Sequence, residues 1–301
     1  MNHLFEPLGV TDVRMESDPL PTASYWQDAF KRFKANRLAM AGLWVLIVLL
    51  SLSVIAPFLT RYSYYETHLG LNNASPCKAF WFGTDELGRD LFTRIWWGAR
   101  ISLFVGITAS CVDLVIGVLY GSIAGLCGGK VDELMMRVAD ILHSIPYLLV
   151  VILLMVVIGS GMKSIILALT ITGWISMARM VRGQILQLGQ LDFITAAKAV
   201  GASRRRILFR HLLPNALGPI IVTLTLTIPT AIFAEAFLSF LGLGVQAPIA
   251  SWGAMANDGL PAVRYYPWRL FFPAGFISLT MLSFNLLGDG LREAFDPRLK
   301  L

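Results

Sequence analysis

Charge is scarce in this sequence. Only 15 % of its 301 residues are charged, whereas 56 % are hydrophobic; a typical soluble domain carries about 25 % charged residues. The mean hydropathy is +0.65. A water-soluble domain is therefore excluded, and the composition predicts an integral membrane protein. The expected fold class is an all-α membrane protein whose apolar helices cross the bilayer.

Motifs for catalysis and ligand binding are also few. The three cysteines, Cys77, Cys111 and Cys127, are odd in number, and their spacing fits neither a disulfide framework nor a metal site. Lys130 follows two glycines but precedes Val131, where a P-loop needs a serine or threonine. We therefore expect no nucleotide site, no metal, no cofactor and no catalytic residue, and the chain is not predicted to be an enzyme.

Six apolar runs predict six transmembrane helices. A helix needs about 20 apolar residues to cross the hydrocarbon core. The run from Leu38 to Thr60 exceeds that length without a charge, and the second run contains a single charge, Asp113. The expected spans are 38–60, 101–129, 141–162, 164–178, 212–241 and 270–288.

Six spans place both termini on one side of the membrane. Many of the 25 lysines and arginines lie before the first span, between the second and third spans, and from residue 179 to residue 210. Cytoplasmic segments collect Lys and Arg, so cytoplasmic termini are predicted, and the net charge of +6 requires no nucleic-acid partner. Residues 1–37 are expected to form a cytoplasmic tail with an amphipathic segment, and residues 38–301 the transmembrane domain.

The stretch from Asp192 to Pro214 is strongly charged within an apolar second half. Asp192 is expected to cap a short helix over residues 193–200, because its carboxylate can accept from first-turn amides. Gly201 then ends this helix, since glycine adopts a left-handed conformation without steric cost. Ser203 is expected to cap a second helix, which Pro214 stops. The pattern predicts two short helices that meet at a glycine turn.

This pattern of helix caps, glycine turn and proline resembles the EAA loop of ABC-importer permeases. In that family the loop forms the coupling helices, which lie in a groove of the ATPase subunit. Two positions depart from the family pattern: Thr195 replaces the usual glutamate, and His211 stands where isoleucine is common. The resemblance assigns ATPase coupling to residues of the 192–214 stretch, namely Thr195, Ala196, Ala197, Gly201, Ala202, Ser203 and Pro214.

Further motifs narrow the resemblance. FGTDELGRD at 82–90, followed by R-x-x-x-G-A-R-x-S-L at 94–103, looks like the hallmark of the dipeptide, oligopeptide and nickel branch of these permeases. Matching stretches at 128–137, 237–253 and 285–300 extend it. Together with WQDAFKRFKANR before the first span, they resemble the C-type subunits of oligopeptide permeases. The resemblance covers the chain from about residue 25 onward.

The resemblance implies a type I ABC-importer permease fold in a bacterial cytoplasmic (inner) membrane. It implies that the chain forms half of a translocation pathway for oligopeptides or dipeptides, beside a second homologous permease in a heterodimer. Two cytoplasmic ABC ATPases would drive the pathway, and an extracytoplasmic peptide-binding protein would load it. An importer of nickel or another small ligand is the alternative within the same branch.

Two acidic residues inside the predicted spans, Asp113 and Glu235, are candidates for the translocation path. A charged carboxylate at the bilayer centre costs on the order of 3 kcal/mol unless it is paired or hydrated. Each residue therefore faces either the substrate route or the interior of the bundle, where it would be hydrogen-bonded or protonated for packing. Both alternatives remain open from the sequence.

Two other classes fit the sequence less well. An ion-coupled secondary carrier would need no partners and would show repeated halves with broken helices, and we find no internal repeat. An intramembrane hydrolase would need a nucleophile and a base at membrane depth. His143 lies close to the inner charge cluster and has no obvious serine partner.

Overall fold

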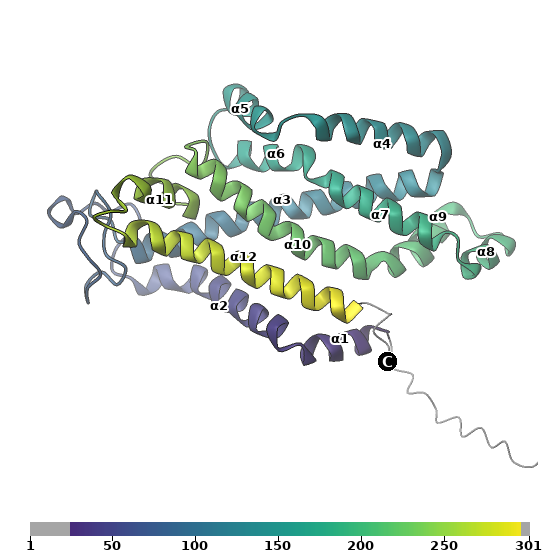
Figure 1. Cartoon of the computed structure of the whole chain (residues 1–301), viewed down its shortest axis with the longest axis horizontal. Coiled ribbons are helices and arrows are strands. Elements are labelled where there is room, and N and C mark those ends of the chain that lie inside the picture. The colour runs from purple at the N-terminus through teal and green to yellow at the C-terminus, as the bar shows by residue number, and fades with distance from the viewer. Residues whose placement is uncertain (1–24, 296–301) are drawn as a thin grey trace, which may run out of the picture.

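The computed structural model describes residues 25–295; most of the expected N-terminal tail, residues 1–24, and residues 296–301 lie outside this range. Long helices run side by side along one axis (Figure 1). The four longest are α2 (Arg37–Leu59), α3 (Leu91–Cys127), α10 (Leu213–Phe240) and α12 (Trp268–Phe295).

Two further spans are composite. α6 (Met162–Thr172) and α7 (Trp174–Leu188) follow each other as one apolar stretch, whereas α4 (Gly129–Ser144) and α5 (Tyr147–Ile158) are bent by 78°. The shorter elements are α1 (Tyr25–Ala35), η1 (Leu69–Leu71), α8 (Asp192–Ala199), α9 (Arg204–Ile207), the π-helical turn η2 (Leu208–Leu212), α11 (Trp252–Gly259) and η3 (Leu260–Ala262).

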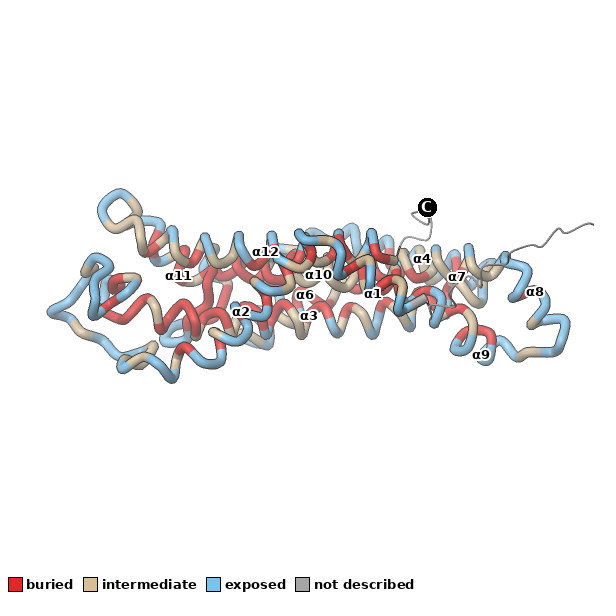
Figure 2. Tube along the Cα trace, turned by 90° about the horizontal axis from the view of Figure 1, so that it is seen from below, coloured by how far each residue is buried: buried red, intermediate tan, exposed pale blue. Residues whose placement is uncertain are grey.

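The predicted all-α membrane fold is confirmed. Over residues 25–295, five helices are long and apolar enough to cross a membrane, or six when the bent pair counts as one span. The only β-type pairing in that range is an isolated bridge between Thr84 and Asp90. Buried residues follow the inner faces of the helices, and exposed residues cover the outside and both ends (Figure 2). Helix packing supplies the core.

Several span boundaries differ from the prediction; the last span, for example, extends to Phe295 and not to residue 288. α3 begins at Leu91 and not at residue 101, because Asp90 caps it by accepting from Thr93 N at 2.9 Å. The expected span 141–162 is broken near Pro146, which cannot donate a backbone hydrogen bond and which disfavours a helical conformation at Ile145. The expected span 164–178 extends to Leu188, since its arginines find acidic partners on α4.

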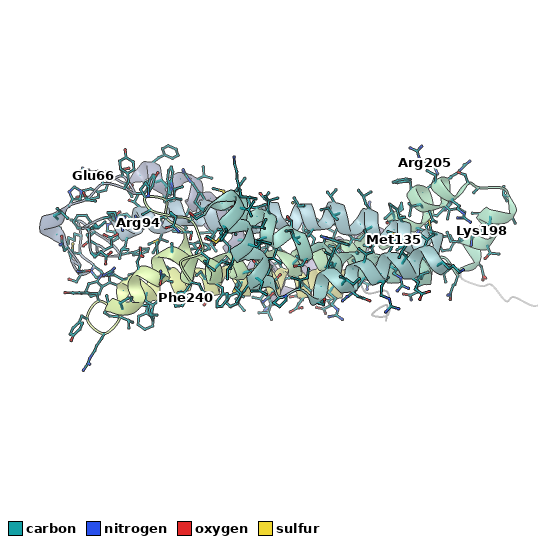
Figure 3. The ribbon with its side chains drawn as sticks, turned by 90° about the horizontal axis from the view of Figure 1, so that it is seen from above. Glu66, Arg94, Met135, Lys198, Arg205 and Phe240 are labelled. Atoms are coloured by element: carbon teal, nitrogen blue, oxygen red, sulfur yellow. The ribbon has the colours of Figure 1, made fainter. Side chains whose placement is uncertain are left out.

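The described ends of the chain lie at one end of the bundle. The rings of Trp26 in α1 and Phe295 in α12 are 5.5 Å apart in an edge-to-face contact. α8 and α9 project at the same end, with Lys198 and Arg205, whereas Glu66 and Arg94 lie at the opposite end (Figure 3). This arrangement agrees with an even number of spans.

A stripe of glycines lets α3 and α7 approach closely. Gly117, Gly121 and Gly125 recur at every fourth position of α3, so that they share one face. A Cβ at Gly121 would overlap the carbonyl oxygen of Ala178 in α7, and a Cβ at Gly117 would lie 2.6 Å from the Cβ of Met177. Small residues at such a face allow the backbones of membrane helices to come together.

We predict that Gly121→Ala destabilises the protein by about 1 to 3 kcal/mol, the usual cost of overpacking a core, because the added methyl group meets backbone rather than a flexible side chain. Thermal unfolding of the detergent-solubilised protein, followed by size-exclusion fluorescence, measures the change. Gly183→Ala in α7 is the matched control, since a Cβ there meets nothing within 4 Å. Equal melting temperatures for the two variants would contradict the close approach.

Candidate functional site

The element formed by α8, the Gly201 turn and α9 lies at the end of the bundle, beyond α7 (Figure 1). α8 begins at Asp192, but Leu191 occupies the cap position and no side chain caps this helix. The predicted capping role of Asp192 is therefore wrong. Asp192 lies in the first turn, where a negative charge still interacts favourably with the helix dipole.

The glycine turn is confirmed. Gly201 has a φ of +86°, a left-handed conformation that residues with a Cβ rarely adopt. Its amide donates to the carbonyl of Lys198 at 3.0 Å, and the amide of Ala202 donates to the carbonyl of Ala197 at 3.0 Å. These bonds satisfy carbonyls that the end of α8 would otherwise leave unpaired.

Ser203 caps the second helix as predicted, accepting from the amide of Arg206 at 3.3 Å. Pro214, however, does not stop that helix. The chain passes through η2, where the amide of Leu213 reaches back to the carbonyl of Leu208, and continues into α10 with Pro214 in its first turn. The wider turn and the position near a helix start both suit a residue that lacks an amide hydrogen.

One face of this element is fixed to the bundle. Ile194 in α8 is fully buried, as is Val181 in α7. Both belong to an apolar cluster that joins α7 to the 192–214 stretch and to α10, made of Met177, Val181, Ile185, Ile194, Ile207, Leu208, Leu212, Ala216 and Ile220. The cluster holds the element in one orientation relative to α7.

Most of the positions assigned to coupling are exposed and carry small side chains, beside exposed larger residues such as Phe193 and Lys198. Of the positions assigned to coupling, Ala197 and Ala202 are half-buried, and the exposed ones are Thr195, Ala196, Gly201, Ser203 and Pro214. Val200, next to the glycine, is 89 % exposed. The structure therefore brings six of the seven predicted residues, all but Pro214, onto one projecting element with an apolar residue beside the turn, whereas Pro214 lies in α10.

Ion pairs tie α7 to α4 at this end of the bundle. Arg182 contacts Asp132 through two hydrogen bonds of 2.5 and 2.6 Å, and Arg179 donates to Asp140 at 2.8 Å. The hydroxyl group of Tyr120 in α3 donates to the carbonyl of Met135 at 2.6 Å. Arginine suits such planar, bidentate pairing with carboxylates. α3, α4 and α7 therefore form one connected unit beneath the projecting element.

A buried ionic network occupies the other end of the bundle, and the sequence analysis missed it. Asp85 accepts from Arg89 Nε at 2.6 Å and lies 3.5 Å from Arg94 Nε. Arg269 in α12 donates to Asn73 and pairs with Glu86 at 3.1 Å. The four-residue spacing of Asp85 and Arg89 was the one sequence signal that could have predicted this network. Nothing in the sequence indicated that Arg94 of α3 and Arg269 of α12 would join it.

Asp258 in α11 lies beside this network. Its backbone carbonyl accepts from Arg269 at 2.8 Å. Burial raises the pKa of Asp258, and the neighbouring Arg94 opposes that effect. The loop between α2 and α3, the start of α3, α11 and α12 are thus held together by a charge network in which Asp85, Arg94 and Arg269 are buried and Glu86 and Asp258 are exposed.

Glu235 lies in the interior, where three helices meet. Its side chain is fully buried in α10 and accepts from Ser102 of α3 and from Ser239, each at 2.8 Å. Ser102 Oγ in turn lies 3.3 Å from the backbone amide of Trp252 in α11, which donates to it. This geometry favours the packing alternative for Glu235, because both carboxylate oxygens have protein partners.

Asp113 lies at the start of the glycine stripe of α3. It is 3 % exposed, and its Oδ1 atom has no hydrogen-bond partner within the described residues. A Cβ at Gly173, between α6 and α7, would overlap the Asp113 carboxylate. Asp113 therefore faces the α6–α7 junction and not the outer surface of the bundle.

We predict that Asp113→Asn leaves substrate uptake near the wild-type level, because the amide keeps the shape and hydrogen-bonding capacity of the side chain while removing the charge. Uptake by cells that lack the chromosomal copy measures this, with membrane levels of the variant as the control. Loss of uptake at normal membrane levels would contradict an interior packing role and place Asp113 in the translocation path.

Comparison with known proteins identifies the class. Residues 117–301 match the family described as binding-protein-dependent transport system inner membrane component, and residues 24–76 match the N-terminal transmembrane domain of oligopeptide transport permease C. The chain is similar in fold to the MetNI methionine ABC transporter in inward-facing conformations, with a TM-score of 0.57 and 20 % identity over 66 % of this chain and 94 % of that one.

Relatives cover nearly the whole chain. The oligopeptide transport system permease protein OppC of Bacillus subtilis (strain 168) is 56 % identical over 99 % of this chain and 98 % of its own length. The dipeptide transport system permease protein DppC of the same strain is 58 % identical over 93 % and 88 %. OppC of Escherichia coli (strain K12) is 46 % identical over 91 % and 92 %.

The helical bundle and its projecting element are thus those of a multi-pass membrane component of a transport system. The chain belongs to the family of binding-protein-dependent transport system inner membrane components. It is a protein of the inner membrane.

Proposed function

We propose that the chain is a permease subunit of an ATP-driven ABC importer for oligopeptides or dipeptides. The oligopeptide and dipeptide permeases among its relatives support the substrate class. An importer of nickel or another small ligand remains the alternative, because Asp113 and Glu235 report no ligand directly. Uptake of tri-alanine and of nickel by cells with and without the chain separates the two.

The assembly follows from the same proposal. The chain forms half of the pathway, and a second homologous permease forms the other half. Two cytoplasmic ATPases bind the 192–214 element, and an extracytoplasmic peptide-binding protein docks at the end that carries residues 60–90. The subunit itself hydrolyses nothing; residues 38–301 form its permease domain, and residues 1–37 its cytoplasmic tail and amphipathic segment.

The observation that carries this proposal is the set of small, exposed residues in the element from α8 to α9, namely Thr195, Ala196, Gly201 and Ser203. Its buried face is fixed to α7 through Ile194, so a force applied to the exposed face reaches the bundle without loss in a flexible loop. Small side chains at Ala196 and Gly201 leave room for a groove to close around the helix. This is the geometry that coupling to an ATPase needs.

The proposed orientation is testable with a single thiol. Ser203 is exposed in the projecting element, and we predict that Ser203→Cys reacts with an impermeant maleimide only after the cytoplasmic face is opened. Cys77, also exposed, should react from outside in intact cells. A background in which Cys77, Cys111 and Cys127 are all replaced by serine isolates the signal of the new thiol, because all three native cysteines are exposed. Reaction of Ser203→Cys in intact cells would reverse the orientation.

We predict that Gly201→Val inserts normally but fails to hold or drive the ATPases. A Cβ there meets no atom within 4 Å, so the substitution acts only on the left-handed backbone, at a cost of roughly 1 to 2 kcal/mol. That cost is small beside the packing of the bundle, whereas each 1.4 kcal/mol of lost contact lowers the occupancy of a partner groove about tenfold.

Co-purification of the ATPases and substrate-stimulated ATP hydrolysis in proteoliposomes measure the effect. Gly183→Val is the matched control, because Gly183 is exposed in a helix and a Cβ there is equally free of contacts. Wild-type values for Gly201→Val in both assays would show that this element does not couple the permease to its ATPases.

A further inference from the structure

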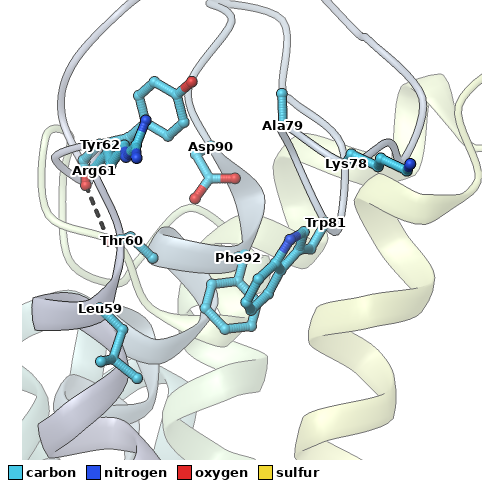
Figure 4. A pocket seen from close by; sticks show the side chains of 9 residues that line it. All are labelled: Leu59, Thr60, Arg61, Tyr62, Lys78, Ala79, Trp81, Asp90 and Phe92. Atoms are coloured by element: carbon cyan, nitrogen blue, oxygen red, sulfur yellow. Dashed lines mark hydrogen bonds between the residues drawn. The ribbon is translucent and has the colours of Figure 1, made fainter.

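A pocket of about 330 Å³ opens between the end of α2, the loop that follows it and the start of α3 (Figure 4). Its floor is Asp90, and its walls include three aromatic side chains. The lining residues are Leu59, Thr60, Arg61, Tyr62, Lys78, Ala79, Trp81, Asp90 and Phe92. None of them has a role in the coupling element or in the paths discussed above.

Asp90 is buried but only half satisfied. It is 3 % exposed, and its Oδ2 atom accepts from the amide of Thr93 at 2.9 Å and from the hydroxyl group of Thr93 at 2.5 Å. Its Oδ1 atom has no hydrogen-bond partner among residues 25–295. An unpaired carboxylate oxygen in a buried site is costly, so a donor from outside the chain would stabilise it.

Burial raises the pKa of Asp90, and the two hydrogen bonds from Thr93 oppose that effect. Because both Thr93 groups donate, the side chain acts as an acceptor at its inner oxygen. A cation beside Oδ1 would favour the ionised form. The site therefore lacks a positive group at Oδ1.

The walls select an organic cation over a metal ion. Figure 4 shows the Asp90 carboxylate between the ring of Tyr62 and the rings of Trp81 and Phe92. Aromatic faces attract ammonium groups through cation–π interactions. A metal ion would need several oxygen, nitrogen or sulfur ligands, and residues 25–295 contain no group of three or more His, Cys, Asp or Glu side chains that could hold one.

Two basic side chains at the pocket set a second requirement for its ligand. Arg61 and Lys78 are exposed at this pocket, and neither forms an ion pair within the part of the chain that the structure describes. Together they would repel a lone cation, whereas they would attract an anionic group carried by the same ligand. Figure 4 shows Arg61 and Lys78 on opposite sides of Asp90, so a ligand with both charges can pair with Asp90 and with one of the two basic residues at once.

We propose that this pocket binds a zwitterionic molecule whose primary ammonium group contacts Asp90 and whose anionic group contacts one of the two basic residues at the rim, Arg61 or Lys78. Two sources share this chemistry. One is the headgroup of phosphatidylethanolamine, since the pocket lies where α2 ends. The other is a free short peptide, with an ammonium and a carboxylate at its two ends. This inference does not depend on the coupling element or on transport.

Binding to the full-length protein in nanodiscs tests the proposal. In discs of phosphatidylglycerol, which carries no amine, isothermal titration with tri-alanine tests the peptide source, with N-acetyl-tri-alanine as the matched ligand that lacks the ammonium group. In discs that also contain phosphatidylethanolamine, native mass spectrometry of retained lipid tests the lipid source. Neither measurement requires nucleotide or a partner protein. Both therefore test the binding proposal even if uptake assays contradict the proposed importer function.

Asp90→Asn removes the charge and keeps a good helix cap, because Asn and Asp cap equally well. We expect it to weaken binding by roughly 30-fold or more, as expected when one partner of a buried charge pair is lost. Glu66→Gln, which removes a charge from the same loop outside the pocket, should bind like the wild type. The double variant Arg61→Gln, Lys78→Gln leaves the α3 cap untouched and should also weaken binding.

Saturable binding of either ligand that is lost in both pocket variants supports the proposal and names the source. Failure of the wild type to bind either ligand overturns it, as does wild-type affinity in Asp90→Asn. Loss in Asp90→Asn with full binding in the double variant would overturn the zwitterionic assignment. Binding of N-acetyl-tri-alanine as tightly as tri-alanine would overturn the role of the ammonium group.

Discussion

The close approach of α3 and α7 is the constraint on which the rest of the structure depends. It exists because Gly117, Gly121 and Gly125 leave the backbone of α7 room that any larger side chain would fill. α7 leads directly to α8, so the position of the projecting element is set by this contact and by the ion pair between Arg182 and Asp132. In a bilayer, where burial of apolar surface gives little driving force between helices, such packing and polar contacts decide association.

The two ends of the bundle are held by different means. At the end with α8, apolar side chains around Ile194 fix the element, and small residues such as Ala196 and Gly201 are exposed on it. At the opposite end, Asp85, Arg94 and Arg269 add buried ionic contacts to an apolar cluster around Leu91 and Ile95. Removing one member of such a buried ionic group leaves the others uncompensated, so this end should tolerate substitution less well than its position in loops would indicate.

Features that depend on neighbouring residues could be predicted from the sequence, whereas features that depend on residues distant in the chain could not. The first span, Gly201 and Ser203 were predicted correctly, because an uncharged run, a left-handed turn and a cap depend on a few neighbouring residues. α3 starts early since Asp90 caps it and Arg94 finds Asp85, a pairing that periodicity does not reveal. Pro146 breaks the predicted third span at Ile145, whereas Pro214 lies within a helix after the π turn. The presence of a proline in the sequence does not by itself tell whether the helix ends or continues.

That second proline has a mechanical consequence. Because Pro214 does not stop the helix, α9, η2 and α10 form one continuous helical stretch from Arg204 to Phe240. We infer that a displacement of α9 by a partner is carried along α10 as a whole. Near the far end of α10, Glu235 is hydrogen-bonded to Ser102 of α3, and α3 is packed against α7 through the glycine stripe. α10, α3 and α7 therefore close a loop of contacts that runs from the projecting element across the bundle and back, so these helices should tilt together and not slide past one another.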